Sequence, residues 1–185
     1  MRMWMLMMLV TGLSMAILMI SLYNGLVRKR NLVRSAFSSI DVNLRKRHDL
    51  IPSLVDTVKG FARHEQDTLT ALMEARSRIR DTSLDESERL RLEREIGPRM
   101  GRLIALAEDY PELRSDAHFL NLQRNLTEVE EQISAARRAY NAAVLAMNNA
   151  VETFPGNLIA SRFGFRRHDF FEVDQPAREP SRMSV

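Results

Sequence analysis

Apolar and polar residues follow two different patterns along the chain. Residues 3–27 carry no charge, and as a helix this run is about 37 Å long, against about 30 Å for the hydrocarbon core of a bilayer. Trp4 and Tyr23 lie near its two ends, where such rings prefer the membrane interface. The pattern predicts a transmembrane anchor.

A cleaved signal peptide is the alternative for this run. Its apolar region is about 7–15 residues long, between a basic start and a small-x-small cleavage site. Here the run is longer, only Arg2 precedes it, and residues 23–26 (Tyr-Asn-Gly-Leu) offer no such site. The residues favour an uncleaved anchor.

The charges beside the anchor predict its orientation, because basic residues are retained on the cytoplasmic side. Four basic residues follow the run within residues 28–34, whereas Arg2 precedes it. We therefore expect an outside N-terminus and a cytoplasmic C-terminal domain. The predicted membrane-interface residues are Trp4, Tyr23, Arg28, Lys29 and Arg30.

Beyond the anchor, apolar residues recur at helical spacing. No glycine or proline interrupts residues 26–51, so the anchor can continue into the first soluble helix. Its apolar stripe is Leu26, Val33, Phe37, Ile40 and Leu44. Because proline suits the first turn of a helix, Pro52 predicts that a second helix begins at Asp49 or Leu50.

Two further helices are expected before residue 111. The helix that begins at Asp49 or Leu50 should end near residues 81–83, and its Gly60 should mark a close helix crossing. Acidic residues 85–88 suit the N-terminus of the third helix, whose weak point is Gly97-Pro98, where proline forces a kink or a break. Tyr110-Pro111 ends this helix.

The fourth helix has the strongest periodic signal. Ser115 or Asp116 can cap its start, and residues 154–156 (Phe-Pro-Gly) stop it. Its apolar residues step by three and four, which predicts coiled-coil-like packing. They are Phe119, Leu122, Leu126, Val129, Ile133, Ala136, Tyr140, Ala143, Met147 and Val151.

The expected fold is all-α, since no alternating apolar run indicates a strand. Residues 1–27 form the N-terminus and anchor, residues 28–153 an elongated antiparallel four-helix bundle, and residues 154–185 a tail. The last 12 or so residues, with Pro176 and Pro180, are predicted to be disordered.

Composition and the spacing of polar residues argue against several classes of function. The chain has no cysteine, which excludes disulfides and thiol chemistry, and a net charge of only +3, which argues against nucleic acid as a partner. None of the four histidines follows a Glu or Asp by three positions, as a di-iron bundle would require. Catalytic motifs are absent, so we predict no catalytic, metal or cofactor-binding residues and no cofactor.

Polar residues near the helical stripes leave two interpretations open. Asp41, Asn43 and Asn141 could line a ligand site, although interhelical hydrogen bonds that fix register are the preferred explanation. Glu128, Glu130 and Glu131 are interpreted as an exposed acidic face.

The tail mixes aromatic and basic residues. It could bind an acidic membrane or single-stranded nucleic acid, but the preferred interpretation is that the rings fold back on an open end of the bundle. The candidate interaction residues are Asn157, Leu158, Ile159, Phe163, Phe165, Phe170 and Phe171.

Several short motifs, in order, resemble the LemA family. They include residues 23–27 (YNGLV), 39–42 (SIDV), 47–55 (RHDLIPSLV), 58–61 (VKGF), 64–65 (HE), 107–113 (AEDYPEL), 119–123 (FLNLQ), 136–141 (ARRAYN), 154–160 (FPGNLIA), 163–165 (FGF) and 170–172 (FFE). The match covers nearly the whole chain. Residues 182–185 (RMSV) depart from the family's usual Lys-Val-Ser-Phe end, and Gly97-Pro98 is a second departure.

The resemblance implies a single-pass bacterial inner-membrane protein with a cytoplasmic helical bundle and no established catalytic activity. Members tied to magnetosome membranes suggest an organising role. The preferred hypothesis is a non-enzymatic scaffold that binds the bilayer through residues 3–27 and docks unidentified proteins or a second copy. The alternatives are a ligand- or metal-binding sensor or enzyme, and a membrane-remodelling protein that acts through its tail.

Overall fold

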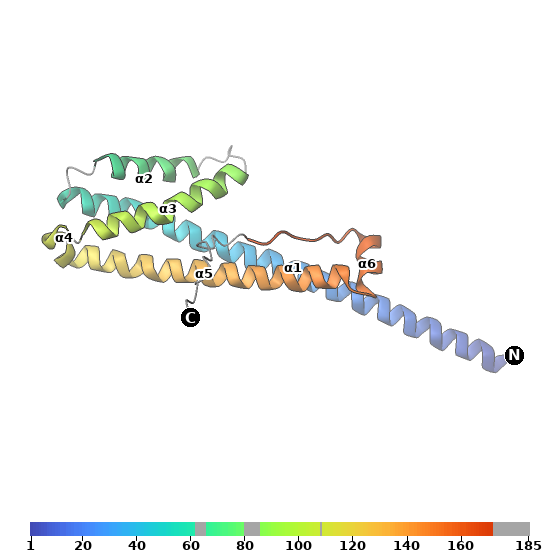
Figure 1. Cartoon of the computed structure of the whole chain (residues 1–185). Helices are drawn as coiled ribbons and strands as arrows, with labels where there is room; N and C mark the ends of the chain where they lie inside the picture. Colours follow the sequence, from blue (N-terminus) through green and yellow to red (C-terminus); the bar gives the residue numbers. More distant parts are fainter. Residues whose placement is uncertain (62–65, 80–85, 108, 172–185) are drawn as a thin grey trace, which may run out of the picture. The chain divides into compact units, whose positions relative to one another are not determined.

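The computed structural model describes residues 1–61, 66–79, 86–107 and 109–171. These residues form helices and no strand, so the all-α prediction is confirmed. The elements are α1 (Arg2–Phe61), α2 (Gln66–Ile79), α3 (Glu86–Leu106), α4 (Pro111–Ser115), α5 (Ala117–Glu152) and α6 (Gly156–Phe163) (Figure 1). The short helices α4 and α6 are not predicted by the hydrophobic pattern.

The chain divides into two compact units. Unit 1 is Met1–Ser38 with Ala136–Val185, and unit 2 is Ser39–Ala135. Helices α1 and α5 each contribute to both units. The region predicted as one bundle, residues 28–153, therefore includes parts of both.

Helix α1 corrects the predicted start of a second helix at Asp49 or Leu50, because it continues through Pro52 to Phe61. Proline has no N–H, so the carbonyl of His48, four residues earlier, loses its helical donor. Arg76 of α2 replaces that donor, with its Nε 2.8 Å from the His48 oxygen. A tertiary hydrogen bond thus stabilises the helix where local sequence favours a boundary.

The close helix crossing predicted at Gly60 is wrong, and the break that was one alternative predicted at Pro98 does not occur. Gly60 is exposed, with nothing within 4 Å of a Cβ placed there, so it marks no close helix crossing. Helix α3 is unbroken through Pro98, where Ile96, Met100 and Leu103 are all buried and hold both sides of the proline in the core. The predicted helix end at residues 81–83, acidic residue 85 and the motif residues His64 and Glu65 lie outside the described residues.

Unit 2 has a core to which α1, α2, α3, α4 and α5 all contribute. Leu54, Leu72, Ile96, Leu113 and Phe119 are among its buried members. Asp116 caps α5 as predicted, accepting a hydrogen bond of 2.8 Å from the Phe119 N–H. Five helices therefore share a core in this unit.

Unit 1 has a smaller core built by α1, α5 and α6. Leu26 and Val33 of α1 meet Val144 and Met147 of α5, with Ile159 of α6. The predicted α5 stripe is confirmed, since its members are buried apart from Tyr140 and Val151, which are half-buried. Phe37 corrects the α1 stripe: it is largely exposed, because few elements cover α1 in this unit.

The N-terminal part of α1 is the one candidate membrane span among the described residues. Its most apolar window has a mean hydropathy of 2.3, and none of that window is buried. Figure 1 shows this part of α1 projecting beyond α5 and α6 of the same unit. The predicted apolar helix is therefore present, but only its residues 3–21 are all exposed, whereas Leu22, Leu26 and Val27 pack in the core of unit 1.

Candidate functional site

Two asparagines of α5 hold the tail of unit 1 in an extended conformation. The Asn148 amide donates to the His168 carbonyl at 2.9 Å, and its oxygen accepts from the His168 N–H at 2.9 Å. Asn141 makes the same pair of bonds with Phe171, at 3.0 and 2.8 Å. We call these two residues the asparagine clamp; it binds main-chain atoms, so it recognises an extended backbone rather than a particular side chain.

The spacing of the clamp matches the repeat of an extended chain. Asn141 and Asn148 are two helical turns apart on one face of α5, which is about 10.5 Å. His168 and Phe171 are three residues apart, which is about 10 Å in extended backbone. The tail runs antiparallel to α5, as Figure 1 shows, so two side chains fix both its register and its direction.

Aromatic and cation–π contacts at Phe165 and Phe171 also hold the tail in place. The Phe171 ring lies 4.8 Å from the Arg137 guanidinium carbon and in edge contact with Tyr140. The Arg30 guanidinium carbon lies 5.2 Å from the centre of the buried Phe165 ring. These cation–π contacts add to the clamp, each by about 0.5–1 kcal/mol where exposed.

The predicted interaction residues divide into two groups. Ile159 and Phe165 are buried in the unit 1 core, and Asn157 and Phe171 are half-buried. Leu158, Phe163 and Phe170 remain exposed. The expectation that the tail's apolar residues fold back therefore holds for the first group and is wrong for the second.

The predicted membrane-interface residues lie on α1. Trp4 is exposed on the bare part of the helix. Tyr23 lies where protein packing begins, with its ring centre 5.0 Å from Phe163 and 5.7 Å from Phe165. Arg28 is exposed, whereas Lys29 and Arg30 are half-buried.

A buried charged network lies inside unit 2, and none of the residues predicted as a functional site belongs to it. Arg47 and Glu93 are 2% and 4% exposed, and Arg47 Nη2 donates to the Glu93 carboxylate at 2.6 Å. Arg47 Nη1 donates to Glu130 at 3.0 Å. His48 Nε2 lies 3.0 and 3.1 Å from the two Glu93 oxygens. The network joins α1, α3 and α5 by mutual pairing of charges, which is the condition under which burial of such groups is tolerated.

The sequence does contain a signal for this network. Arg47 and His48 follow Leu44 by three and four positions, and Glu93 precedes Ile96 by three, so all of them fall on apolar stripes. A charge on such a stripe predicts a buried partner of opposite charge. Glu130, interpreted as part of an exposed acidic face, in fact pairs with Arg47.

The polar residues singled out on the helical stripes have separate roles. Asp41 pairs with Arg45 and Asn43 donates to the Ser39 carbonyl, both four residues away within α1. Asn141 belongs to the clamp. The structure does not bring these three residues together at a ligand site.

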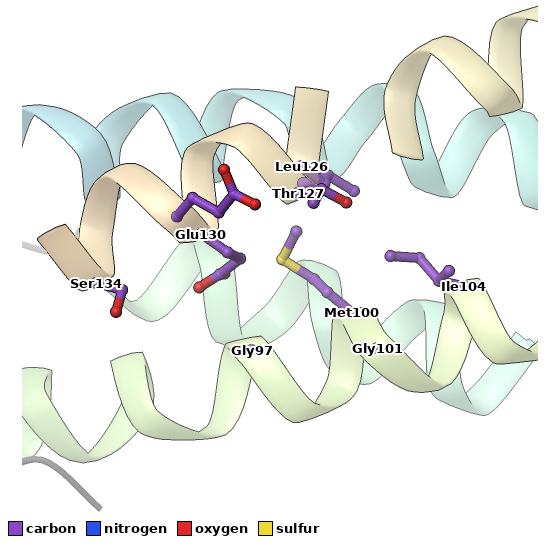
Figure 2. Close-up of a pocket in the computed structure, with 9 residues that line it drawn as sticks. Gly97, Met100, Gly101, Ile104, Leu126, Thr127, Glu130 and Ser134 are labelled. Carbon is purple, nitrogen blue, oxygen red and sulfur yellow. The ribbon is translucent and has the colours of Figure 1, made fainter. Parts of the chain in front are cut away.

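A groove of about 470 Å³ lies between α3 and α5 in unit 2. Gly97 and Gly101 open its α3 wall, and Met100 points from α3 toward Leu126 and Thr127 (Figure 2). The volume is within the range of small-molecule sites. The described residues contain no group of three or more His, Cys, Asp or Glu side chains that could hold a metal ion.

Fold and sites together define an all-helical protein with a single candidate span among its described residues, an internally clamped tail and a paired charge network. A family model for the LemA family matches residues 36–184. The chain belongs to the LemA family, which confirms the resemblance carried by its motifs. The departing residues 182–185 and the motif residue Glu108 lie outside the described residues.

Among relatives, Protein LemA of Metamycoplasma hominis is 24% identical over 155 residues, which cover 84% of this chain and 71% of the relative. Magnetosome protein MamQ 2 of Paramagnetospirillum magneticum is 34% identical over 82 residues, 44% of this chain. Magnetosome protein MamQ of Magnetospirillum gryphiswaldense is 30% identical over 82 residues. The matched segment spans only 30% of either MamQ protein.

Proposed function

We propose that this chain is a non-enzymatic scaffold that is anchored in the bacterial inner membrane by residues 3–27 and docks other proteins on its helical units. The observation that carries the anchor is the exposed apolar N-terminal part of α1, of which no part of the most apolar window is buried. Such a surface in water would be far larger than the apolar patches that soluble monomers tolerate. A bilayer covers it without any further protein.

The proposed orientation places the N-terminus outside, and unit 2 and the part of unit 1 beyond the span in the cytoplasm. Arg28, Lys29 and Arg30 follow the span directly, and basic residues resist translocation. Two of the relatives are magnetosome proteins by name, which supports a membrane setting for this chain as well.

Thiol labelling tests the anchor and its orientation, because the chain has no native cysteine. Met3→Cys should react with a membrane-impermeant maleimide on intact spheroplasts, and Ala139→Cys should react only after permeabilisation. Both variants should fractionate with membranes and resist carbonate extraction. Recovery of the protein in the soluble fraction, shortened at its N-terminus, would contradict the proposal.

The docking role is supported by the asparagine clamp and the exposed Phe170. The clamp fixes the tail on α5 at His168 and Phe171, so the exposed ring of Phe170 is presented at a defined position. Other proteins or a second copy are the proposed partners. No nucleic acid is proposed, since the net charge is only +3.

Site-specific crosslinking tests the docking role in native membranes. A photoreactive residue at Phe170 should give discrete adducts or homo-oligomers, and the same residue at Leu120 of unit 2 serves as an exposed control. Equal, diffuse labelling from both positions, or uncrosslinked monomer throughout, would contradict docking at this surface.

A small-molecule sensor is the second candidate function, favoured by the groove between α3 and α5. Met100, Ile104 and Leu126 give it apolar walls beside the Glu130 carboxylate. Native mass spectrometry of the full chain released from membranes should then show one bound compound, lost in a Gly101→Leu variant that fills the groove. A consistently unliganded mass would count against this function.

A further inference from the structure

The α6 helix carries an exposed apolar surface that the fold leaves uncovered. Phe154 before the helix and Leu158 and Phe163 within it are 74%, 59% and 56% exposed. Ile159 and Ala160 are buried in the core of unit 1, on the side of α6 opposite Leu158, whereas Phe163 follows Ile159 by four residues, shares its side and contacts Tyr23. Apolar side chains therefore stay exposed just before α6 at Phe154, on its outer side at Leu158 and on the free part of the Phe163 ring at its end.

The position of α6 along α1 indicates what covers the other side. Tyr23 is in edge contact with Phe163 and Phe165, and Leu22 is the first residue of α1 that packs against the unit 1 core. All earlier residues of α1 are exposed. Protein packing thus begins at residue 22, and α6 is attached there.

The length of the exposed N-terminal segment places one surface of the bilayer near residue 22, where protein packing begins. Residues 3–21 of a helix are about 28 Å long, close to the roughly 30 Å of a hydrocarbon core. When this segment spans the bilayer, Tyr23 and the attached α6 come to the headgroup region. Figure 1 shows α6 running across the direction of α5 within unit 1, as expected for a helix that lies flat on a membrane.

The charges around α6 fit the same surface. Arg162 and Arg166 are exposed beside the apolar residues, and Arg28 is exposed on α1 nearby in sequence to Tyr23. Basic side chains at the edge of an apolar face are attracted to anionic lipid headgroups.

We infer that α6 is an interfacial helix: Phe154, Leu158 and Phe163 insert into the headgroup and acyl boundary of the bilayer that holds the span. This inference rests on the proposed anchor. It gives the protein a second membrane contact, which restricts the tilt of the part of unit 1 that lies beyond the span.

Tryptophan depth measurements on the full chain test the inference, because Trp4 is the single native tryptophan. The protein is reconstituted into anionic vesicles whose lipids carry bromine near the headgroup end of the acyl chain. Three proteins are compared: the native chain, Trp4→Phe with Leu158→Trp, and Trp4→Phe with Leu32→Trp. Leu32 is the matched control, since it is 55% exposed and about 13 Å beyond Tyr23 along α1.

Leu158→Trp should be quenched at least about twofold more strongly than Leu32→Trp, with a blue-shifted emission. If the native Trp4 is quenched while Leu158→Trp and Leu32→Trp stay equally unquenched, the span is inserted and the inference about α6 is wrong. Equal, strong quenching of both introduced residues would also overturn it, because the whole unit would then lie on the membrane. An unquenched Trp4 would refute the anchor itself, and the inference with it.

Discussion

At the scale of single residues, the buried charges of unit 2 depend on one carboxylate. Glu93 faces both Arg47 and His48, so its carboxylate is the shared partner of two buried side chains. Removing one member of a buried ion pair costs far more than the intact pair contributes, because the remaining charge stays buried.

Glu93→Gln is expected to lower the free energy of unfolding by about 3 kcal/mol, since the amide keeps the shape but leaves Arg47 with Glu130 as its remaining carboxylate. Denaturant unfolding in detergent, followed by circular dichroism, measures the change. Glu95→Gln is the control on the same helix: Glu95 pairs with Arg99 at 3.1 Å on the surface, so its loss should cost less than about 1 kcal/mol. An equal loss in the free energy of unfolding for the two variants would show that the buried network stabilises the protein no more than a surface ion pair does.

Gly156 shows how a single residue without a side chain fixes the position of α6. A Cβ at Gly156 would overlap the backbone carbonyl of Ala150, which cannot move without distorting the end of α5. The close approach of the two helices, and with it the placement of Ile159 in the core, requires glycine at this position.

At the scale of the helices, α1 keeps its course through Pro52 because Arg76 supplies the missing donor to His48. Arg76→Ala should therefore destabilise the protein by about 1–2 kcal/mol, the cost of leaving that carbonyl unpaired. In a Pro52→Ala background the helix regains its own N–H donor, so the same substitution should cost clearly less. A double-mutant cycle from denaturant unfolding measures this coupling; additive effects would exclude it.

The asparagine clamp makes the tail a separable element of unit 1. Asn141→Ala with Asn148→Ala removes four hydrogen bonds to residues 168 and 171, while the Phe165 anchor in the core remains. Tryptic cleavage after Arg166 and Arg167 should become about tenfold faster or more, because local opening of the tail becomes easier.

Asn149→Ala supplies the matched control for this experiment, since Asn149 is the exposed neighbour of Asn148. Its cleavage rate should equal that of the native chain. Unchanged cleavage in the double variant would mean that the aromatic contacts alone hold the tail.

At the scale of the whole molecule, the orientation proposed for the chain depends on charge balance across the candidate span. Arg28→Gln, Lys29→Gln and Arg34→Gln together leave one arginine close to each end of the span, Arg2 before it and Arg30 after it. A mixed orientation is then expected, because the basic excess on the cytoplasmic side is lost.

Maleimide accessibility of Ala139→Cys on intact spheroplasts measures the inverted fraction. Arg102→Gln, Arg114→Gln and Arg124→Gln remove the same charge far from the span and should leave the orientation unchanged. Equal behaviour of the two triple variants would contradict a charge-determined orientation.

The sequence by itself determined the helical class, the apolar run of α1, the α5 stripe and the cap at Asp116, because periodicity and capping depend on residues close together in the chain. Tertiary structure decided that α1 passes Pro52, that Arg47 meets Glu93, and that Asn141 and Asn148 hold residues 168 and 171. Each of these depends on a partner about 20 to 50 positions away, and hydrophobic periodicity carries no information about which distant polar group supplies a hydrogen bond. The family and the candidate span follow from local pattern, whereas the clamp, the charge network and the place of α6 beside Tyr23 exist only in the folded chain.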